Sequence, residues 1–116
     1  AKHHGIQHLA LPLRPNQKHL YPLISMEDYL SWTNEDMEPF DPWIRVHIKS
    51  GGSIVSVCSE SMTISGSVSE WEEWTGLEFQ SSGEYIVANA LCSVDIDLEK
   101  NMGTYIEPNV WMIHTL

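Results

Sequence analysis

Apolar and polar residues alternate along the chain in patterns that predict several short helices and strands, and segment 41–52 is the best defined of these. Asp41 can accept hydrogen bonds from the backbone N–H groups of a first helical turn. Pro42 suits the first helical position, where no backbone donor is needed. Gly51 or Gly52 can adopt the left-handed conformation that ends a helix. The segment therefore predicts a short helix with both ends defined.

The apolar side of this helix has a histidine at its centre. Trp43, Ile44, His47, Ile48 and Gly51 recur at helical spacing and would share one face. A neutral imidazole on a buried helix face can act as a general acid or base, because its pKa lies near neutral pH. The same position also suits a core histidine bonded to a backbone carbonyl. The pattern leaves both roles open for His47.

The other elements are predicted from the same patterns. A nearly continuous apolar run at 6–11 is typical of a strand buried on both faces in a parallel or mixed sheet, and Pro12 would end it. Ser69 could cap a short helix with Glu72 reaching back, and Gly76 would end that helix. We also expect a helix at 26–32, strands at 53–58, 62–68 and 84–97, a bulge at 89–90, a turn at 101–103, and a last strand at 104–116 interrupted at Pro108.

Together these elements predict an α+β fold with a mixed, mainly antiparallel sheet and two or three short helices. A chain of 116 residues forms at most one domain. We expect residues 1–116 to be a single domain or half-domain. Its parts would be a buried strand and loop in 1–24, two short helices in 25–52, and antiparallel strands in 53–116 with a Trp-containing helix near 70–76.

Composition indicates a cytoplasmic protein without nucleic-acid or membrane partners. Sixteen acidic and six basic side chains give a net charge of −10, whereas nucleic acid and anionic membranes both require a basic surface. No apolar run is long enough to span a bilayer. Cys58 and Cys92 lie in apolar, strand-like contexts, which favours two buried thiols in a reducing compartment, although one disulfide bridge stays open.

The six histidines raise the question of a metal site. His3, His4 and His8 are close in sequence, but a ligand pair one helical turn apart needs a continuous helix, and Gly5 interrupts it. We therefore expect these histidines to be exposed or locally bonded, with no metal bound.

Aromatic residues are the candidate walls of a substrate pocket. Trp71 and Trp74 lie at helical spacing and could line or close a pocket, or pack against the sheet. Tyr105 and Trp111 lie on the last predicted strand. The sequence alone leaves packing and binding roles open for these four residues.

The order of elements resembles the C-terminal half of the GNAT-type N-acetyltransferases. That family has a helix that closes on a motif like Tyr-x-x-x-Gly-Phe, and Val46-His47-Ile48-Lys49-Ser50-Gly51-Gly52 is similar to it. His47 stands where the family often has a tyrosine that acts as general acid. The other matching features are a helix end at His4–Gly5, the strand at 6–11, and segments 68–78 and 103–114.

This resemblance implies direct acyl transfer from a thioester, acetyl-CoA or another acyl-CoA, to a small-molecule amine. His47 would transfer the proton, and Trp71, Trp74, Tyr105 and Trp111 would bind substrate. The family's pyrophosphate-binding loop would lie upstream of Ala1, so the chain is expected to be inactive without a complementing N-terminal half. The alternative is a non-enzymatic, acidic binding or assembly module that forms homo-oligomers.

Overall fold

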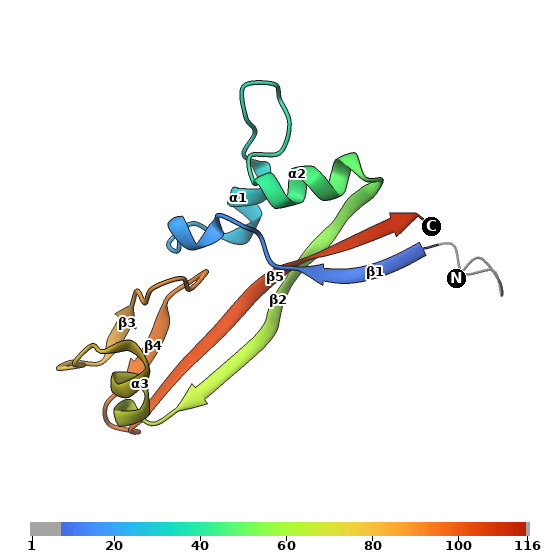
Figure 1. The fold of residues 1–116 in the computed structure, drawn as a ribbon. Helices are drawn as coiled ribbons and strands as arrows, with labels where there is room; N and C mark the ends of the chain where they lie inside the picture. The colour runs from blue at the N-terminus through green and yellow to red at the C-terminus, as the bar shows by residue number, and fades with distance from the viewer. Residues whose placement is uncertain (1–7, 116) are drawn as a thin grey trace.

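The fold is built on one long strand that pairs with three others. The structure, a computed structural model, describes residues 8–115. Strand β5 (Met102–Thr115) pairs along its length with β2 (Gly52–Gly66), while its other edge pairs with β1 (His8–Leu13) and β4 (Val94–Asp97) (Figure 1). Strand β3 (Gly83–Tyr85) extends the sheet beyond β4. Every pairing is antiparallel, which confirms an α+β fold with a mainly antiparallel sheet.

Helix α2 (Pro42–Lys49) begins and ends as the sequence predicts. The Asp41 carboxylate accepts hydrogen bonds from the N–H groups of Trp43 and Ile44, and Pro42 occupies the first turn. Gly51 follows the helix with a φ of 97°, in the left-handed region that favours glycine. The predicted helix ends are confirmed, and the helix lies over one end of the β2–β5 pair (Figure 1).

Two further helices and one 3₁₀ turn complete the helical elements. Helix α1 (Met26–Ser31) begins at Ser25, whose side chain accepts from the Asp28 N–H, so the predicted helix at 26–32 is confirmed. The 3₁₀ turn η2 (Lys18–Leu20) precedes it. Both lie near α2 at the same end of the molecule (Figure 1).

The N-cap of α3 (Val68–Thr75) is not the predicted one. Ser67, and not Ser69, accepts from the Glu70 N–H, while the Glu70 carboxylate accepts from the Ser67 N–H. This reciprocal capping box satisfies two donors, and it starts the helix one residue before Ser69. The predicted helix end is confirmed, because Gly76 has a φ of 75°.

The two strands predicted at 53–58 and 62–68 are one continuous strand, β2. Its pairing with β5 is irregular between Cys58 and Met62, so residues 59–61 have no register partner. Pro108 lies opposite this irregularity. Because the local ladder is already interrupted there, the missing N–H of proline is tolerated, and β5 continues where the sequence predicted a break.

Strand β1 is an exposed edge strand and not the buried strand of a mixed sheet. It pairs with β5 alone, and most of its residues are exposed. Pro12 lies inside it, opposite Trp111, because an edge strand needs no second ladder. The predicted helix end at His4–Gly5 and the start of the predicted strand lie outside the described residues.

The single strand predicted at 84–97 is divided into β3 and β4. Between them the chain leaves the sheet, and Asn89 has a φ of 67°, a left-handed conformation that asparagine tolerates better than most residues. The following turn comes earlier than predicted, at residues 98–101, with Asn101 at a φ of 52°.

Two apolar clusters pack on the sheet. One joins α1 and α2 to β1 and the C-terminal half of β5 through Leu13, Met26, Tyr29, Ile44, Leu91, Val110 and Met112. The other joins α3 to β4 and the first half of β5 through Trp71, Phe79, Ala90, Val94, Ile96 and Tyr105. Cys58 and Cys92 are both free thiols and partly buried. Within the described chain no helix is long and apolar enough to cross a bilayer.

Candidate functional site

Strand β5 presents a row of buried residues on one face, three of which have polar side chains. Gly103, Tyr105, Glu107 and Asn109 alternate with more exposed residues, as the two-residue period of a strand requires, and all four are buried. The sequence-based expectations included only Tyr105 of these. The remaining members were missed, although alternation of Tyr, Glu and Asn in a predicted strand was the available signal.

Glu107 is the centre of this row. Its side chain is almost fully buried, with 3% of the residue exposed. Oε1 accepts from the Tyr105 hydroxyl at 2.8 Å and from Arg14 Nε at 3.1 Å, and Oε2 accepts from Asn109 Nδ2 at 3.2 Å. Ser61 Oγ in turn donates to Asn109 Oδ1 at 2.8 Å. A buried carboxylate is stable only with such partners, and here one cation and two neutral donors supply them.

Tyr105 joins this carboxylate to the neighbouring loop. Its hydroxyl accepts from the Leu91 N–H at 3.0 Å while donating to Glu107. Burial is the main reason that the pKa of Tyr105 lies well above its usual value, and the hydrogen bond to Glu107 raises it further. The phenol is therefore a hydrogen-bond donor near neutral pH and not a base.

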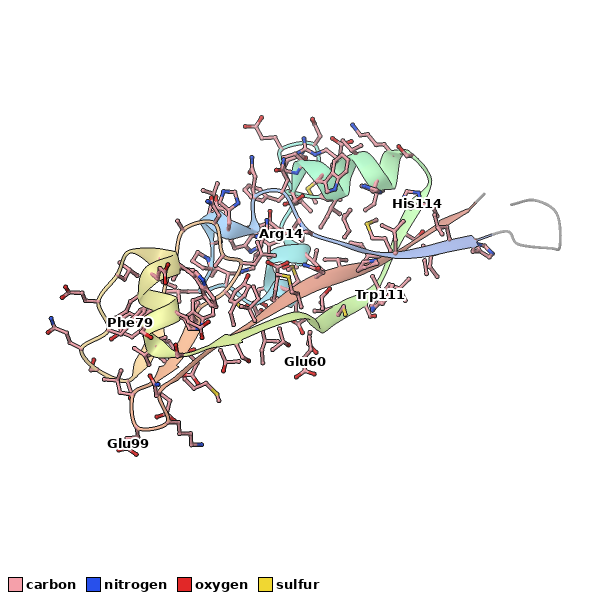
Figure 2. The ribbon with its side chains drawn as sticks, turned by 60° about the horizontal axis from the view of Figure 1, so that its bottom comes forward. Arg14, Glu60, Phe79, Glu99, Trp111 and His114 are labelled. Atoms are coloured by element: carbon pink, nitrogen blue, oxygen red, sulfur yellow. The ribbon has the colours of Figure 1, made fainter. Side chains whose placement is uncertain are left out.

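A cavity of about 220 Å³ lies beside Glu107. Its walls come from Met62 and Ile64 on β2, Trp71 on α3, residues 87–90, and Tyr105 and Glu107 on β5, with Arg14 beside them. Figure 2 places Arg14 in the middle of the molecule, between the two ends of β5. The cavity is smaller than a typical pocket for a drug-sized ligand, roughly 300–1,000 Å³, and suits a side-chain-sized group.

A second hollow of about 390 Å³ adjoins the first across Trp71, and Trp74 lines it too. The Trp71 ring lies directly on β5, because a Cβ at Gly103 would come within 2.3 Å of its Cδ1 atom. Its Nε1 atom is buried and has no partner among the described residues. Trp71, Trp74 and Tyr105, all predicted to bind substrate, are thus brought together at one place.

His47 lies elsewhere, in a pair with His114. His47 Nδ1 and His114 Nε2 are 2.8 Å apart, so the two rings share one proton between them, and His47 Nε2 is buried without a partner in the described chain. Gly52 makes room for the pair, since a Cβ there would lie 2.9 Å from the His114 ring. Burial and the neighbouring His114 lower the pKa of His47, so its ring is neutral near pH 7.

The two groups of predicted site residues lie at different ends of β5. Seven residues separate Glu107 from His114, a span of roughly 23 Å at about 3.3 Å per strand residue. Trp111 lies between Glu107 and His114 along β5, is 37% exposed, and lines neither cavity. The structure therefore brings together three of the five predicted site residues, and the catalytic role of His47 and the binding role of Trp111 stay predictions.

The described residues do not fit the pyrophosphate of an acyl-CoA. Such a group needs free N–H donors at a helix N-terminus or a cluster of basic side chains. The first turns of α2 and α3 already donate to Asp41 and Ser67. Residues 8–115 contain five basic side chains. Protein acceptors hold four of them, which are Arg14, Lys18, Arg45 and Lys49, and the fifth, Lys100, lies in the β4–β5 turn.

No group of three or more potential metal ligands occurs within the part of the chain that the structure describes. His8 is exposed on β1, and His3 and His4 lie outside the described residues.

The sequence is similar to that of one characterised enzyme. The chain is 32% identical over 126 aligned residues to the arginine N-acetyltransferase avaD of Aspergillus versicolor, an alignment that covers 93% of this chain and 43% of that protein.

The chain is therefore related in sequence to an N-acetyltransferase, and it spans less than half the length of that relative. No protein-family model matches the chain, and no solved structure is significantly similar to it.

Proposed function

We propose that this chain is part of an N-acyltransferase that moves an acyl group from a thioester sulfur to an amine nitrogen, with release of the thiol. The observation that carries the proposal is the similarity to an arginine N-acetyltransferase over 93% of the chain. In this proposal the protein is of the GNAT type, the chain corresponds to the C-terminal half of its catalytic domain, and the reaction takes place in the cytoplasm.

The chain's own contribution would be the acceptor side of the reaction. The cavity beside Glu107 has aromatic and apolar walls and a carboxylate at one point, which is the arrangement that binds a small cation. Glu107 would hold the amine acceptor, Trp71 and Tyr105 would form walls around it, and Trp74 would line the adjoining hollow. The protein's negative charge would also raise the local concentration of cationic acceptors.

The acyl-CoA would be bound mainly by another part of the enzyme, because residues 8–115 lack a fitting site for its pyrophosphate. A complementing N-terminal half would supply that site. Two groups are candidates for accepting the proton that the amine loses: the Glu107 carboxylate, and the neutral His47 of a second copy, because His47 of the same chain lies too far from Glu107 along β5.

The test is an acyl-transfer assay on the intact protein with acetyl-CoA and L-arginine or a simple alkylamine, following thiol release and the mass of the acylated amine. We expect turnover that Glu107→Gln lowers at least tenfold. His47→Ala lowers kcat if His47 moves the proton, and leaves it unchanged if Glu107 does. Lys49→Gln, which removes an exposed cation, is the matched control and stays within twofold. Absence of thiol release with every acceptor would exclude the proposal.

A second candidate function is a non-enzymatic, acidic assembly module. It is favoured by β2, which has fifteen residues, pairs with β5 alone, and exposes the apolar side chains of Ile54, Val55, Met62 and Ile64. An unpaired strand edge of this length can pair with a second copy. Size-exclusion chromatography with light scattering and a thermal-shift assay, both on the intact protein that includes its acyl-CoA-binding part, distinguish the two: a tight dimer with no thermal shift on adding acetyl-CoA supports assembly, and a shift supports the enzyme.

A further inference from the structure

Arg14 pairs with Glu107, the carboxylate of the candidate acceptor cavity, but uses only part of its hydrogen-bonding capacity to do so. Its Nε donates to Glu107 Oε1 at 3.1 Å, and Nη2 donates to the Asn89 carbonyl at 2.8 Å. The guanidinium and carboxylate are therefore joined through one hydrogen bond and not through the two parallel bonds of a bidentate pair. The remaining N–H groups of Arg14 have no protein partner within residues 8–115.

Burial of the two partners is very unequal. The Glu107 side chain is 4% exposed, whereas the Arg14 side chain is 47% exposed. A buried carboxylate loses its hydration and requires a cation, while a half-exposed guanidinium can return to water at little cost. Arg14 is therefore replaceable at Glu107, but only by another positive group.

The surroundings suit a guanidinium on a short aliphatic chain. Asn89, in its left-handed conformation, directs a carbonyl oxygen to the same place as Glu107, so that two acceptors converge there. Met62 and Ile64 supply apolar walls for methylene groups, and Trp71 supplies an aromatic wall for the flat cation. The cavity of about 220 Å³ has room for a side chain of this size.

We propose that Glu107 and the Asn89 carbonyl form a recognition site for the guanidinium group of the acyl acceptor, and that Arg14 is an internal occupant that the acceptor displaces. This inference rests on the proposed acyltransferase function in treating the ligand as an acyl acceptor, but the binding site is argued from its own geometry. An anion is disfavoured beside a buried carboxylate, and a neutral isostere would leave that carboxylate without a counter-ion.

Displacement has a measurable consequence. A site that Arg14 occupies most of the time binds a free ligand with an apparent affinity reduced by the vacant fraction. If Arg14 is bound at least nine-tenths of the time, its removal tightens ligand binding at least tenfold. Arg14 thereby sets the concentration at which the acceptor is bound.

Calorimetric titration of the intact protein with L-arginine, and with citrulline as the neutral isostere, tests the proposal. We expect Arg14→Gln to bind L-arginine at least tenfold more tightly than the unmodified protein. Glu107→Gln should lose binding, and citrulline should bind to none of the variants. Lys49→Gln changes the net charge by the same amount as Arg14→Gln but far from the cavity, so it should stay within twofold.

A thermal-shift measurement covers the case in which Arg14→Gln is unstable. Loss of the guanidinium should lower the melting temperature, and L-arginine should restore it where citrulline does not; Arg14→Lys, which keeps the charge, provides a second folded variant of intermediate affinity. Equal effects of arginine and citrulline, or unchanged affinity in both Arg14 variants, would overturn the proposal. Because binding needs no acyl donor, acyl transfer to other amines without arginine binding would refute this inference and leave the proposed function intact.

Discussion

Replacement of Asp41 by alanine should be among the most destabilising single changes in this chain. The residue is 2% exposed, and its carboxylate accepts hydrogen bonds from the Asn16, Gln17, Trp43 and Ile44 N–H groups and from the Tyr29 hydroxyl. It therefore ties the loop after β1, helix α1 and helix α2 to one point. Burial opposes ionisation here, but the hydrogen bonds from Tyr29 and the backbone outweigh it and lower the pKa of Asp41.

The size of the effect follows from what each donor loses. Loss of an N-cap side chain costs about 1 kcal/mol. The buried Tyr29 hydroxyl left without its acceptor costs about 1–3 kcal/mol more. The two loop N–H groups of Asn16 and Gln17 add a smaller amount, because water reaches them. The sum is roughly 2–5 kcal/mol, a large share of the ~5–15 kcal/mol that stabilises a typical domain.

Urea unfolding followed by tryptophan fluorescence and far-UV circular dichroism measures the change. Ser67→Ala is the matched control, because Ser67 caps α3 on the surface and holds no second element, so its loss should cost about 1 kcal/mol. Tyr29→Phe isolates the share of the hydroxyl. If Asp41→Ala costs no more than Ser67→Ala, the three-element junction is not a source of stability and the reasoning is refuted.

Three further changes test other parts of the structure. The contribution of His47 to the free energy of unfolding should be complete above pH 6.5 and decrease below it, because the pKa of His47 is lower in the folded than in the unfolded state, so the unfolded state takes up a proton at higher pH. His47→Gln should flatten this dependence in thermal melts at a series of pH values, and an unchanged slope would contradict the reasoning. Gly103→Ala should cost about 1–3 kcal/mol in urea unfolding, because its Cβ would lie 2.3 Å from the Trp71 ring; wild-type stability would mean that the ring moves freely. Lys18→Met should cost roughly 2–4 kcal/mol, because the buried Leu91 carbonyl and the partly buried Tyr21 carbonyl lose their donor. The exposed Lys49→Met should cost less than about 1 kcal/mol, and equal costs would contradict the burial argument.

Local signals in the sequence predicted the helices better than the sheet. The Asp-Pro start and the glycine end of α2 depend on contacts between residues close in sequence, so they could be predicted without knowledge of the tertiary structure. The capping position of α3 was displaced because Ser67 and Ser69 are both good caps, and each has a glutamate three residues later. In the structure Glu70 accepts from the Ser67 N–H, whereas Glu72 accepts from the Phe79 N–H. Which serine is used depends on a three-residue geometry that the letters alone leave ambiguous.

Strand continuity depends on partners, and that is why it was predicted less well. Pro108 normally interrupts a strand, but the irregularity in β2 opposite it removes the need for its N–H group. Conversely, segment 84–97 has the composition of one strand but is divided: the chain leaves the sheet after Tyr85, and Asn89, whose carbonyl accepts from Arg14, lies in a turn before β4. In both places the contacts involve residues distant in sequence.

The candidate site shows the same limitation. Aromatic residues 71, 74 and 105 were candidates for pocket walls from their type and spacing, with packing roles left open, and they line two adjoining hollows. The carboxylate beside Trp71 and Tyr105 could not be singled out, because the sequence has sixteen acidic residues and only burial distinguishes Glu107 from the solvated ones. Its partner Arg14 is 93 residues away along the chain.

The separation of the two candidate centres along β5 yields a last prediction about catalysis. His114, which contacts His47, lies roughly 23 Å from Glu107 along the strand, several times the length of an amino-acid side chain. One small acceptor bound at Glu107 therefore cannot also contact His47 within this chain. Effects of distant sites are additive within about 0.3–0.5 kcal/mol, so the losses in log kcat/KM from Glu107→Gln and His47→Ala should sum in the double variant. If each single variant loses activity, a double variant no worse than the more damaged single variant would show that both residues act on one reacting molecule, which requires the His47 of a second copy to reach the Glu107 cavity.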